Sequence, residues 1–176
     1  EQHIKREKAT SNICTAQALL ANMAAMYAVY HGPDGLINIA KRVSVLTHTL
    51  ASQLKAHGAN IVSSSYFDTI VVKVADTSAI KAKAEAAQIN FRYFADNTLV
   101  GISLDETTTP SDLFNIISVF DNTDAPVSFE INHDEVLTNI GTSLTRTSSF
   151  LTHPVFNTHH SESQMMRYIK MLENKD

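Results

Sequence analysis

The chain has 176 residues, of which 44% are hydrophobic and 18% charged, and its formal net charge is −4. A chain of this length can bury a core of its own, whereas a net negative charge with scattered Lys and Arg offers nucleic acid no basic surface. A single cysteine, Cys14, excludes an internal disulfide and indicates a reducing, intracellular protein. We expect neither a secreted nor a membrane protein, because no signal peptide is recognisable and no apolar run approaches the ~20 residues of a membrane span.

The first predicted helix covers residues 15–30. Its apolar residues recur at helical spacing with small residues on nearly every side, so we expect burial on more than one face. Residues 31–35, which read His-Gly-Pro-Asp-Gly, should end it, since glycine tolerates a left-handed backbone and proline cannot continue the helix. A second helix is expected over 36–57, with Gly58 as its stop.

After Gly58 the hydrophobic period changes. The run 69–74 is rich in β-branched residues and predicts a strand. A third helix should follow at 78–88, with Asp76 or Thr77 as its cap.

The next segments predict a hairpin and a further helix. Residues 89–94 and 98–103 should pair across the turn 95–97, where Asp and Asn tolerate the required backbone angles. Pro110 should begin a helix that runs to Phe120, because its missing N–H would be unsatisfied at a helix start in any case.

The order of these elements predicts an α+β fold, with a three- or four-stranded sheet and helices on one face. We expect this domain to occupy residues 1–120. Residues 121–176 read as a linker with a short apolar piece near 136–140 and a last helix at 161–174. The apolar stripe of that helix has little nearby sequence to cover it and consists of Met165, Met166, Ile169 and Leu172.

Two polar groups invite functional hypotheses. His153, His159 and His160 could suggest a metal site, but no HExxH motif or cysteine ligand completes a set, so we expect no metal. Ser161 beside His160 could suggest a nucleophile with its base. A capping box, in which Gln164 reaches back to Ser161, explains the same residues more simply.

The turn Thr10-Ser11-Asn12 has a similar pair of readings. Its hydroxyl and amide groups can cap the helix that follows. They can equally meet an anion at that helix N-terminus.

Three stretches together resemble a known family. They are REKATSNICTAQ at 6–17, LDETTT at 104–109, and LTHPVFN at 151–157, which continues through His160-Ser161-Glu162 to MMRY at 165–168. In this order they resemble the P proteins of the glycine cleavage system, which are pyridoxal-phosphate glycine decarboxylases of fold type I. The resemblance covers almost the whole chain and implies an internal piece of a longer protein.

The resemblance implies a place and an activity. Residues 10–120 resemble the small C-terminal-type domain of the first half of a P protein, and residues from 151 resemble the lead-in to its second half. In that family glycine forms an aldimine with pyridoxal 5′-phosphate (PLP), loses carbon dioxide and passes its aminomethyl group to the lipoyl arm of the H protein. Implied partners are the lipoylated H protein, the rest of the P protein and further copies in a homo-oligomer. The implied location is the bacterial cytoplasm, or the mitochondrial matrix in a eukaryote.

The family's cofactor-binding lysine follows a histidine in a Gly-rich stretch of the second half, and no His-Lys pair occurs here. We therefore expect this chain alone to bind no PLP and to be inactive. The resemblance implies that residues of its first and last stretches line or support the active-site cleft of the intact protein. They are Thr10, Ser11, Asn12, Cys14, His153, Asn157, His160, Ser161 and Glu162.

Two alternatives belong to other classes. A free-standing, non-catalytic α+β module for interaction or regulation would share the fold. A zinc hydrolase built on the C-terminal histidines is the less favoured of the two.

Overall fold

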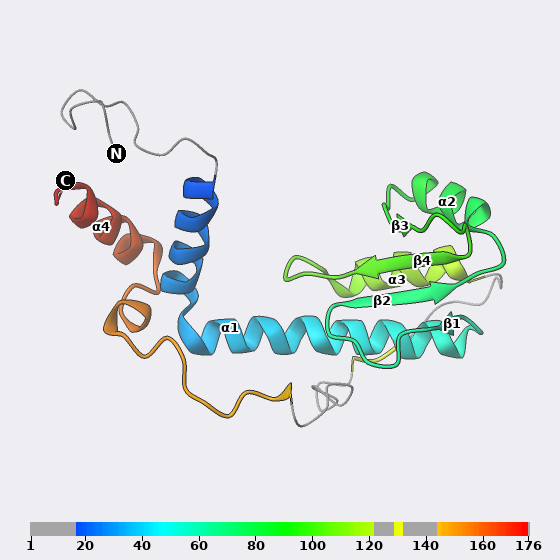
Figure 1. Ribbon diagram of the computed structural model, residues 1–176, viewed down its shortest axis with the longest axis horizontal. Coiled ribbons are helices and arrows are strands. Elements are labelled where there is room, and N and C mark those ends of the chain that lie inside the picture. The colour runs from blue at the N-terminus through cyan, green and yellow to red at the C-terminus, as the bar shows by residue number, and fades with distance from the viewer. Residues whose placement is uncertain (1–16, 122–128, 132–143, 176) are drawn as a thin grey trace, which may run out of the picture. The chain divides into compact units, whose positions relative to one another are not determined.

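The computed structural model describes residues 17–121, 129–131 and 144–175 (Figure 1). They fall into two compact units. The helical unit joins the described residues up to Leu36 with those from Ser148 onward, and the sheet unit runs from Ile37 to Thr147. The long helix α1 (Gln17–Ala56) contributes one part to each. The division at residue 120 expected for the intact protein remains a prediction, and these two units have other limits.

Helix α1 is two helices that meet at Gly32, whose backbone is not helical, with φ 63° and ψ −176°. Pro33 follows directly and stands at the start of the second helix, a position where its fixed φ suits the helix and its missing N–H costs nothing. The predicted break is confirmed, and it is narrower than expected. A single residue outside helical geometry is enough to redirect the chain.

The second helix of α1 ends as the sequence predicts. Gly58 has a φ of 82°, and its N–H donates to the Lys55 carbonyl at 2.9 Å. The next N–H, from Ala59, reaches back to the Leu54 carbonyl at 2.8 Å. These bonds satisfy carbonyls that the helix end would otherwise leave unpaired.

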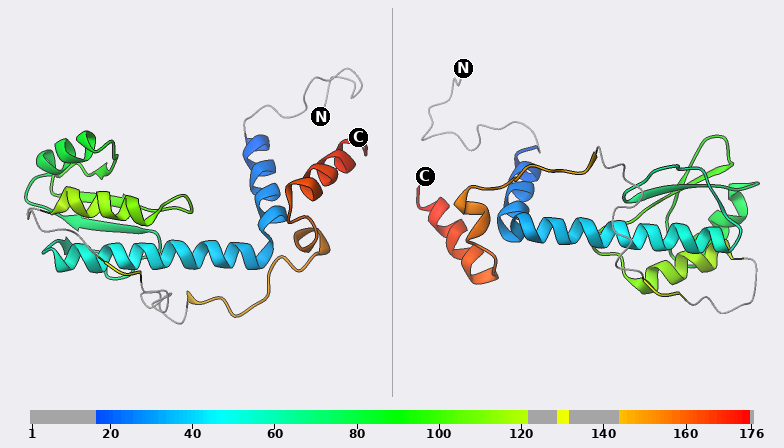
Figure 2. Two further views of the ribbon diagram at one scale, coloured as in Figure 1. Left: turned by 180° about the vertical axis from the view of Figure 1, so that it is seen from behind. Right: turned by 90° about the horizontal axis from the view of Figure 1, so that it is seen from below.

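The sheet has four antiparallel strands in the order β1-β2-β4-β3 (Figures 1 and 2). Their bounds are Asn60–Ile61 for β1, Thr69–Lys73 for β2, Arg92–Tyr93 for β3 and Leu99–Ser103 for β4. The predicted strand and hairpin, and the α+β class, are confirmed. The two-residue strand β1 was not foreseen.

The hairpin turn between β3 and β4 is held by one aspartate. The Asp96 carboxylate accepts hydrogen bonds from the Thr98 N–H at 3.1 Å and from the Thr98 hydroxyl at 2.9 Å. Asn97 takes a left-handed φ of 53°, as its residue type allows.

The sheet buries one face. Ile70 and Val72 of β2 stand opposite Ile102 and Val100 of β4, and all four are buried. Thr69, the first residue of β2, is exposed. Side chains alternate across a strand, so the four buried residues share the face on which the helices pack. The core joins this face to the second part of α1, to α2 (Thr77–Ala86) and to α3 (Pro110–Phe120).

Helix α3 begins with a capping box. The Asp112 N–H donates to the Thr109 hydroxyl at 3.3 Å, and the Thr109 N–H donates to the Asp112 carboxylate at 2.7 Å. Pro110 occupies the first turn, as predicted. Asp76 stands at the N-cap of α2, but its side chain makes no capping hydrogen bond there.

Residues 129–131, which lie in the stretch expected to be linker and lead-in to the second half, contact the sheet unit. Phe129 and Ile131 are partly buried and pack against the core of the sheet unit. The core of the sheet unit therefore includes side chains from beyond the end of α3. The apolar piece expected near 136–140 lies outside the described residues.

The last helix, α4 (Glu162–Glu173), is confirmed with Ser161 as its N-cap, whose hydroxyl accepts from the Gln164 N–H at 3.4 Å. The full capping box is wrong, because the Gln164 side chain accepts from the N–H of His160, one residue before the cap. Among the described residues, no helix has the length and apolarity that a bilayer crossing requires.

Candidate functional site

A pocket lies in the helical unit where the break in α1 meets the segment before α4. Its volume is about 370 Å³. Residues from two distant parts of the sequence line it: Tyr30, His31, Gly32, Pro33, Asp34, Asn157 and His160.

His160 is bound to the end of the first helix of α1. Its Nδ1 lies 2.7 Å from the backbone carbonyl oxygen of Tyr30. A carbonyl oxygen can only accept, so Nδ1 carries the proton and donates it. In the neutral imidazole the other nitrogen, Nε2, is then an acceptor.

Gly32 is what lets His160 come so close. A Cβ on Gly32 would stand 2.7 Å from Cε1 of His160 and 2.7 Å from the backbone oxygen of Phe156, and 3.4 Å from Nε2 of His160. No side chain fits at such distances. The same glycine therefore breaks the helix through its φ and admits the histidine through its missing side chain.

Asn157 is fixed by its own backbone surroundings. Its Nδ2 donates to the carbonyl oxygens of Leu151 at 3.0 Å and His153 at 3.1 Å. An amide NH₂ has two hydrogens, and these bonds use both, which leaves Oδ1 as an acceptor. Asn157 ends the short 3₁₀ helix η3 (Pro154–Asn157).

His153 has a different role from His160. Its Nδ1 accepts a hydrogen bond from the Val155 N–H at 3.2 Å and so caps η3. Nδ1 is therefore unprotonated in His153 and protonated in His160. The two histidines hold opposite tautomers when neutral.

Aromatic contacts brace the wall of the pocket. The ring of His31 lies 4.3 Å from that of Tyr27 and 5.1 Å, edge to face, from that of Tyr30. The Tyr30 hydroxyl donates to Oε1 of Glu162 at 3.4 Å, a long contact that links α1 to the first residue of α4.

The pocket is rich in hydrogen-bond acceptors. Nε2 of His160, Oδ1 of Asn157 and the carboxylate of Asp34 can all accept. Such a set suits a ligand that offers N–H or O–H groups, and the imidazole can also take a proton.

The structure brings together two of the residues expected at a site and leaves others in structural roles. Asn157 and His160 line the pocket. His153, Ser161 and Glu162 lie beside it and hold η3 and α4 in place. The remaining expected residues lie outside the described part of the chain, and they are Thr10, Ser11, Asn12 and Cys14.

Sequence reasoning did not identify five residues of the pocket as site residues: Tyr30, His31, Gly32, Pro33 and Asp34. It treated residues 31–35 only as a helix end. The sequence did offer one signal for a site here, because His31 and Asp34 stand on either side of a Gly-Pro break in the helix. Polar residues at a break between helices are often functional, since such a segment lies at the surface.

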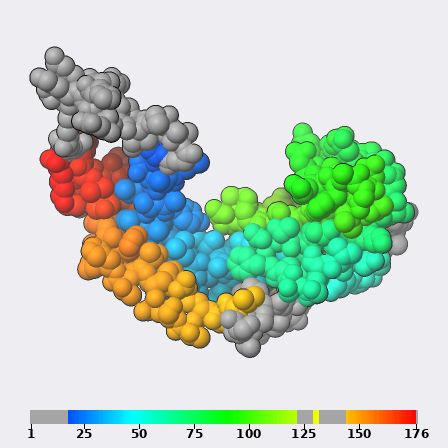
Figure 3. Space-filling view, viewed as in Figure 1, coloured from blue at the N-terminus to red at the C-terminus, as the bar shows by residue number. Residues whose placement is uncertain are grey.

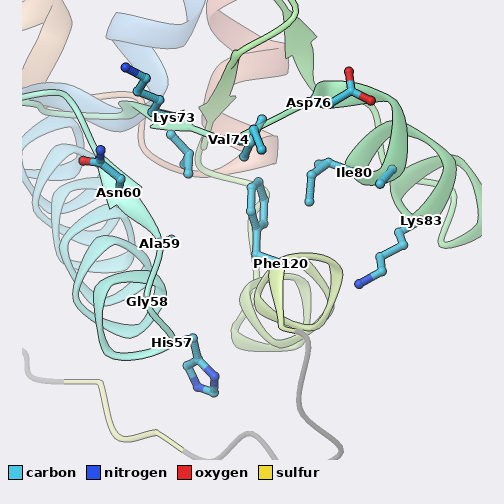
Figure 4. Close-up of a pocket in the computed structure, with 13 residues that line it drawn as sticks. His57, Gly58, Ala59, Asn60, Lys73, Val74, Asp76, Ile80, Lys83 and Phe120 are labelled. Atoms are coloured by element: carbon cyan, nitrogen blue, oxygen red, sulfur yellow. The ribbon is translucent and has the colours of Figure 1, made fainter.

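A second hollow, of about 360 Å³, lies in the sheet unit (Figure 4). Its middle is apolar, with Val74, Ile80 and Phe120 turned toward one another, while His57 points away from them and Lys83 extends from α2 toward the end of α3. His57 Nδ1 lies 3.4 Å from the Asp121 carboxylate, and Lys83 donates to the Asp121 carbonyl at 3.3 Å. These polar contacts hold the end of α3, so we assign this hollow a structural role.

Metal chemistry finds no support in the described residues, where no three His, Cys, Asp or Glu side chains gather closely enough to hold an ion. His159, one of the histidines that could have suggested such a site, stacks on Tyr168 with ring centres 4.4 Å apart.

Comparison with known proteins gives one consistent result. The family model of the glycine cleavage system P-protein matches residues 1–120. The chain is 57% identical over 180 residues to a glycine dehydrogenase (decarboxylating) of Aliivibrio salmonicida, and 52% identical over 183 residues to one of Shewanella halifaxensis. Both alignments cover all of this chain, which spans 18% of the first relative's length and 19% of the second's.

Proposed function

This chain belongs to the glycine cleavage system P-protein family, and we propose that it serves as one part of a glycine dehydrogenase (decarboxylating). The match at 57% identity, which covers all of this chain and 18% of the relative, carries the proposal. The intact protein would decarboxylate glycine and pass the remaining aminomethyl group to the lipoyl arm of an H protein. Family membership argues against a free-standing module or a zinc hydrolase.

PLP supplies the electron sink for decarboxylation in this family. The pocket around Gly32, which we call the helix-break pocket, does not fit this cofactor. The seven residues that line the pocket include no lysine to bond the cofactor and no arginine for its phosphate. We therefore place the cofactor's lysine in another part of the polypeptide. The isolated chain is expected to show no absorbance of bound PLP, which a titration would measure.

We propose that the helix-break pocket contributes to the active-site cleft of the intact protein. Its acceptor groups, Nε2 of His160 and Oδ1 of Asn157, would bind N–H or O–H groups of the substrate, and the His160 imidazole would hold a proton during the reaction. His153, Ser161 and Glu162 would support this wall. Thr10, Ser11, Asn12 and Cys14 would complete the cleft from the segment before α1.

The proposed setting follows from the same family. The partners would be glycine, the lipoylated H protein, the remainder of the P protein and a second copy in a homo-oligomer, and the location would be the bacterial cytoplasm.

A chimera tests this function directly. The 176 residues replace the matching segment of the Aliivibrio salmonicida relative, and exchange of the glycine carboxyl group with bicarbonate is measured with PLP and H protein present. The Shewanella halifaxensis segment, grafted in the same way, is the matched control. We expect exchange in both chimeras. A chimera that folds and binds PLP but shows no exchange, while the control is active, would refute the proposal.

A further inference from the structure

The first part of α1 has an unusual surface for a helix that meets water. Residues 17–33 contain no Lys, Arg, Asp or Glu. All seven residues from 19 to 25 are nonetheless exposed, with Leu19 64%, Leu20 65% and Met23 59% accessible (blue in Figure 3).

Seven consecutive residues pass almost twice around a helix, so the exposed apolar surface is on every side. An amphipathic surface helix instead pairs one apolar stripe with a charged face. A helix that is apolar all round is found inside a protein, and one this short is unstable alone in water. The sequence pattern, which predicts burial on more than one face, points the same way.

Helix α4 shows a related surface. Its residues include none that is buried. Met165 and Leu172 are half-buried within the helical unit, whereas Met166 is 65% and Ile169 41% exposed. The expected apolar stripe is thus divided, and one side of it remains uncovered.

We propose that residues 19–27 of α1, together with Met166 and Ile169 of α4, are a docking surface for the rest of the P-protein polypeptide. The Aliivibrio salmonicida relative is more than five times as long as this chain, which spans 18% of it, so there is ample further polypeptide to enclose a helix.

A second copy fits this surface less well. One copy would cover one side of the helix, but the exposed residues Leu19, Leu20 and Ala25 point to different sides. Alanines at 18, 21, 24, 25 and 28 allow neighbouring helices to approach closely from several directions. The inference rests on the proposed function in one respect, that the chain is one part of a longer P protein, and it holds whether or not the pocket takes part in catalysis.

Photo-crosslinking in the full-length chimera identifies the occupant. A photoreactive amino acid replaces Met23 or Met166, and the control is the same replacement at Ala82, an exposed alanine between two lysines of α2. We expect crosslinks from both methionine positions to sequence outside the 176 residues. Crosslinks within the 176 residues, crosslinks between isotopically distinct copies, or a yield no higher than at Ala82 would each overturn the proposal.

A pair of matched substitutions gives an independent readout. Ala24→Lys and Ala82→Lys both place a charge on an exposed alanine of a helix, and lysine is nearly as good a helix former as alanine. We expect Ala24→Lys to lower the thermal midpoint of the chimera and Ala82→Lys to leave it unchanged. Equal midpoints for the two variants would overturn the proposal.

Discussion

His160 and Tyr30, 130 residues apart in sequence, are joined by a 2.7 Å hydrogen bond from imidazole Nδ1 to backbone carbonyl oxygen. The bond fixes the tautomer of the histidine, since the carbonyl accepts and Nδ1 must donate. It also closes a pocket around the one residue of α1 that is not helical, Gly32.

Gly32→Ala should destabilise the helical unit. The new methyl group would stand 2.7 Å from His160 and from the Phe156 oxygen at a left-handed φ, which predicts a cost of about 2–5 kcal/mol from strain and overpacking together. Gly58→Ala is the control, because its φ is also positive but no atom lies within 4 Å of the new Cβ. Amide exchange of residues 151–160 should rise in the first variant only, and equal exchange in both would contradict the packing argument.

Thr109→Ala should weaken α3 by removing its capping box. Loss of an N-cap hydroxyl typically costs about 1 kcal/mol. Urea unfolding of the sheet unit measures this, and Ser111→Ala, at an exposed position in the first turn of α3, serves as the control. Unchanged urea midpoints in both variants would show that the capping box does not contribute to the stability of the sheet unit.

Stability of the sheet unit should fall in acid. Hydrogen bonds from the Thr109 side chain and N–H lower the pKa of Asp112 below its ordinary 3.8, and bonds from Thr107 and Thr98 lower the pKa values of Asp105 and Asp96. A carboxyl group whose folded pKa is depressed stabilises the fold above its unfolded pKa and loses that contribution as the pH falls through the folded value. Unfolding free energies should therefore drop as the pH is taken from 5 to below 3.8.

The matching variant separates this effect from general acid unfolding. Thr109→Ala removes the side-chain partner of Asp112, so the pKa of Asp112, followed by NMR titration, should rise toward 3.8 while that of Asp96 stays lowered. If the pKa of Asp112 were the same in Thr109→Ala as in the parent, the Thr109 side chain would not be the cause of its lowering.

Phe129→Ala should destabilise the sheet unit although it lies beyond the last helix of that unit. Full burial of a large apolar side chain contributes about 1.5–3 kcal/mol, and Phe129 is only partly buried, so we expect the lower end. Glu130→Ala, at the exposed residue between the two anchors, is the control in the same denaturation experiment. If Phe129→Ala left the free energy of unfolding unchanged, residues 129–131 would be only a linker.

The sequence predicted the elements whose signals are local. Gly32, Gly58 and Pro110 mark helix ends through their own backbone chemistry, and Asp96-Asn97 marks the hairpin through its turn. The pattern could not reveal β1, because two residues become a strand only through their partner β2.

The pocket shows the same limit more strongly. Motif resemblance pointed to His160 and Asn157, yet their neighbours Tyr30 and Asp34 come from a segment 130 residues away that looks like an ordinary helix end. The Gln164 side chain accepts from the N–H of His160 and not from the N–H of the N-cap residue, Ser161. Residue spacing cannot distinguish between two adjacent N–H donors. Long-range contact, not residue type, brings Tyr30 and His160 together.

The carboxyl-exchange rate of the chimera with His160→Asn tests most directly whether the helix-break pocket belongs to the active site. An asparagine can still donate to the Tyr30 carbonyl but lacks Nε2, and His159→Asn, which alters a ring stacked on Tyr168, is the matched control. We predict an exchange rate at least about tenfold lower for His160→Asn, or 1.4 kcal/mol in the barrier, with an unchanged thermal midpoint and near-parental exchange for His159→Asn. Parental exchange in His160→Asn would contradict the account.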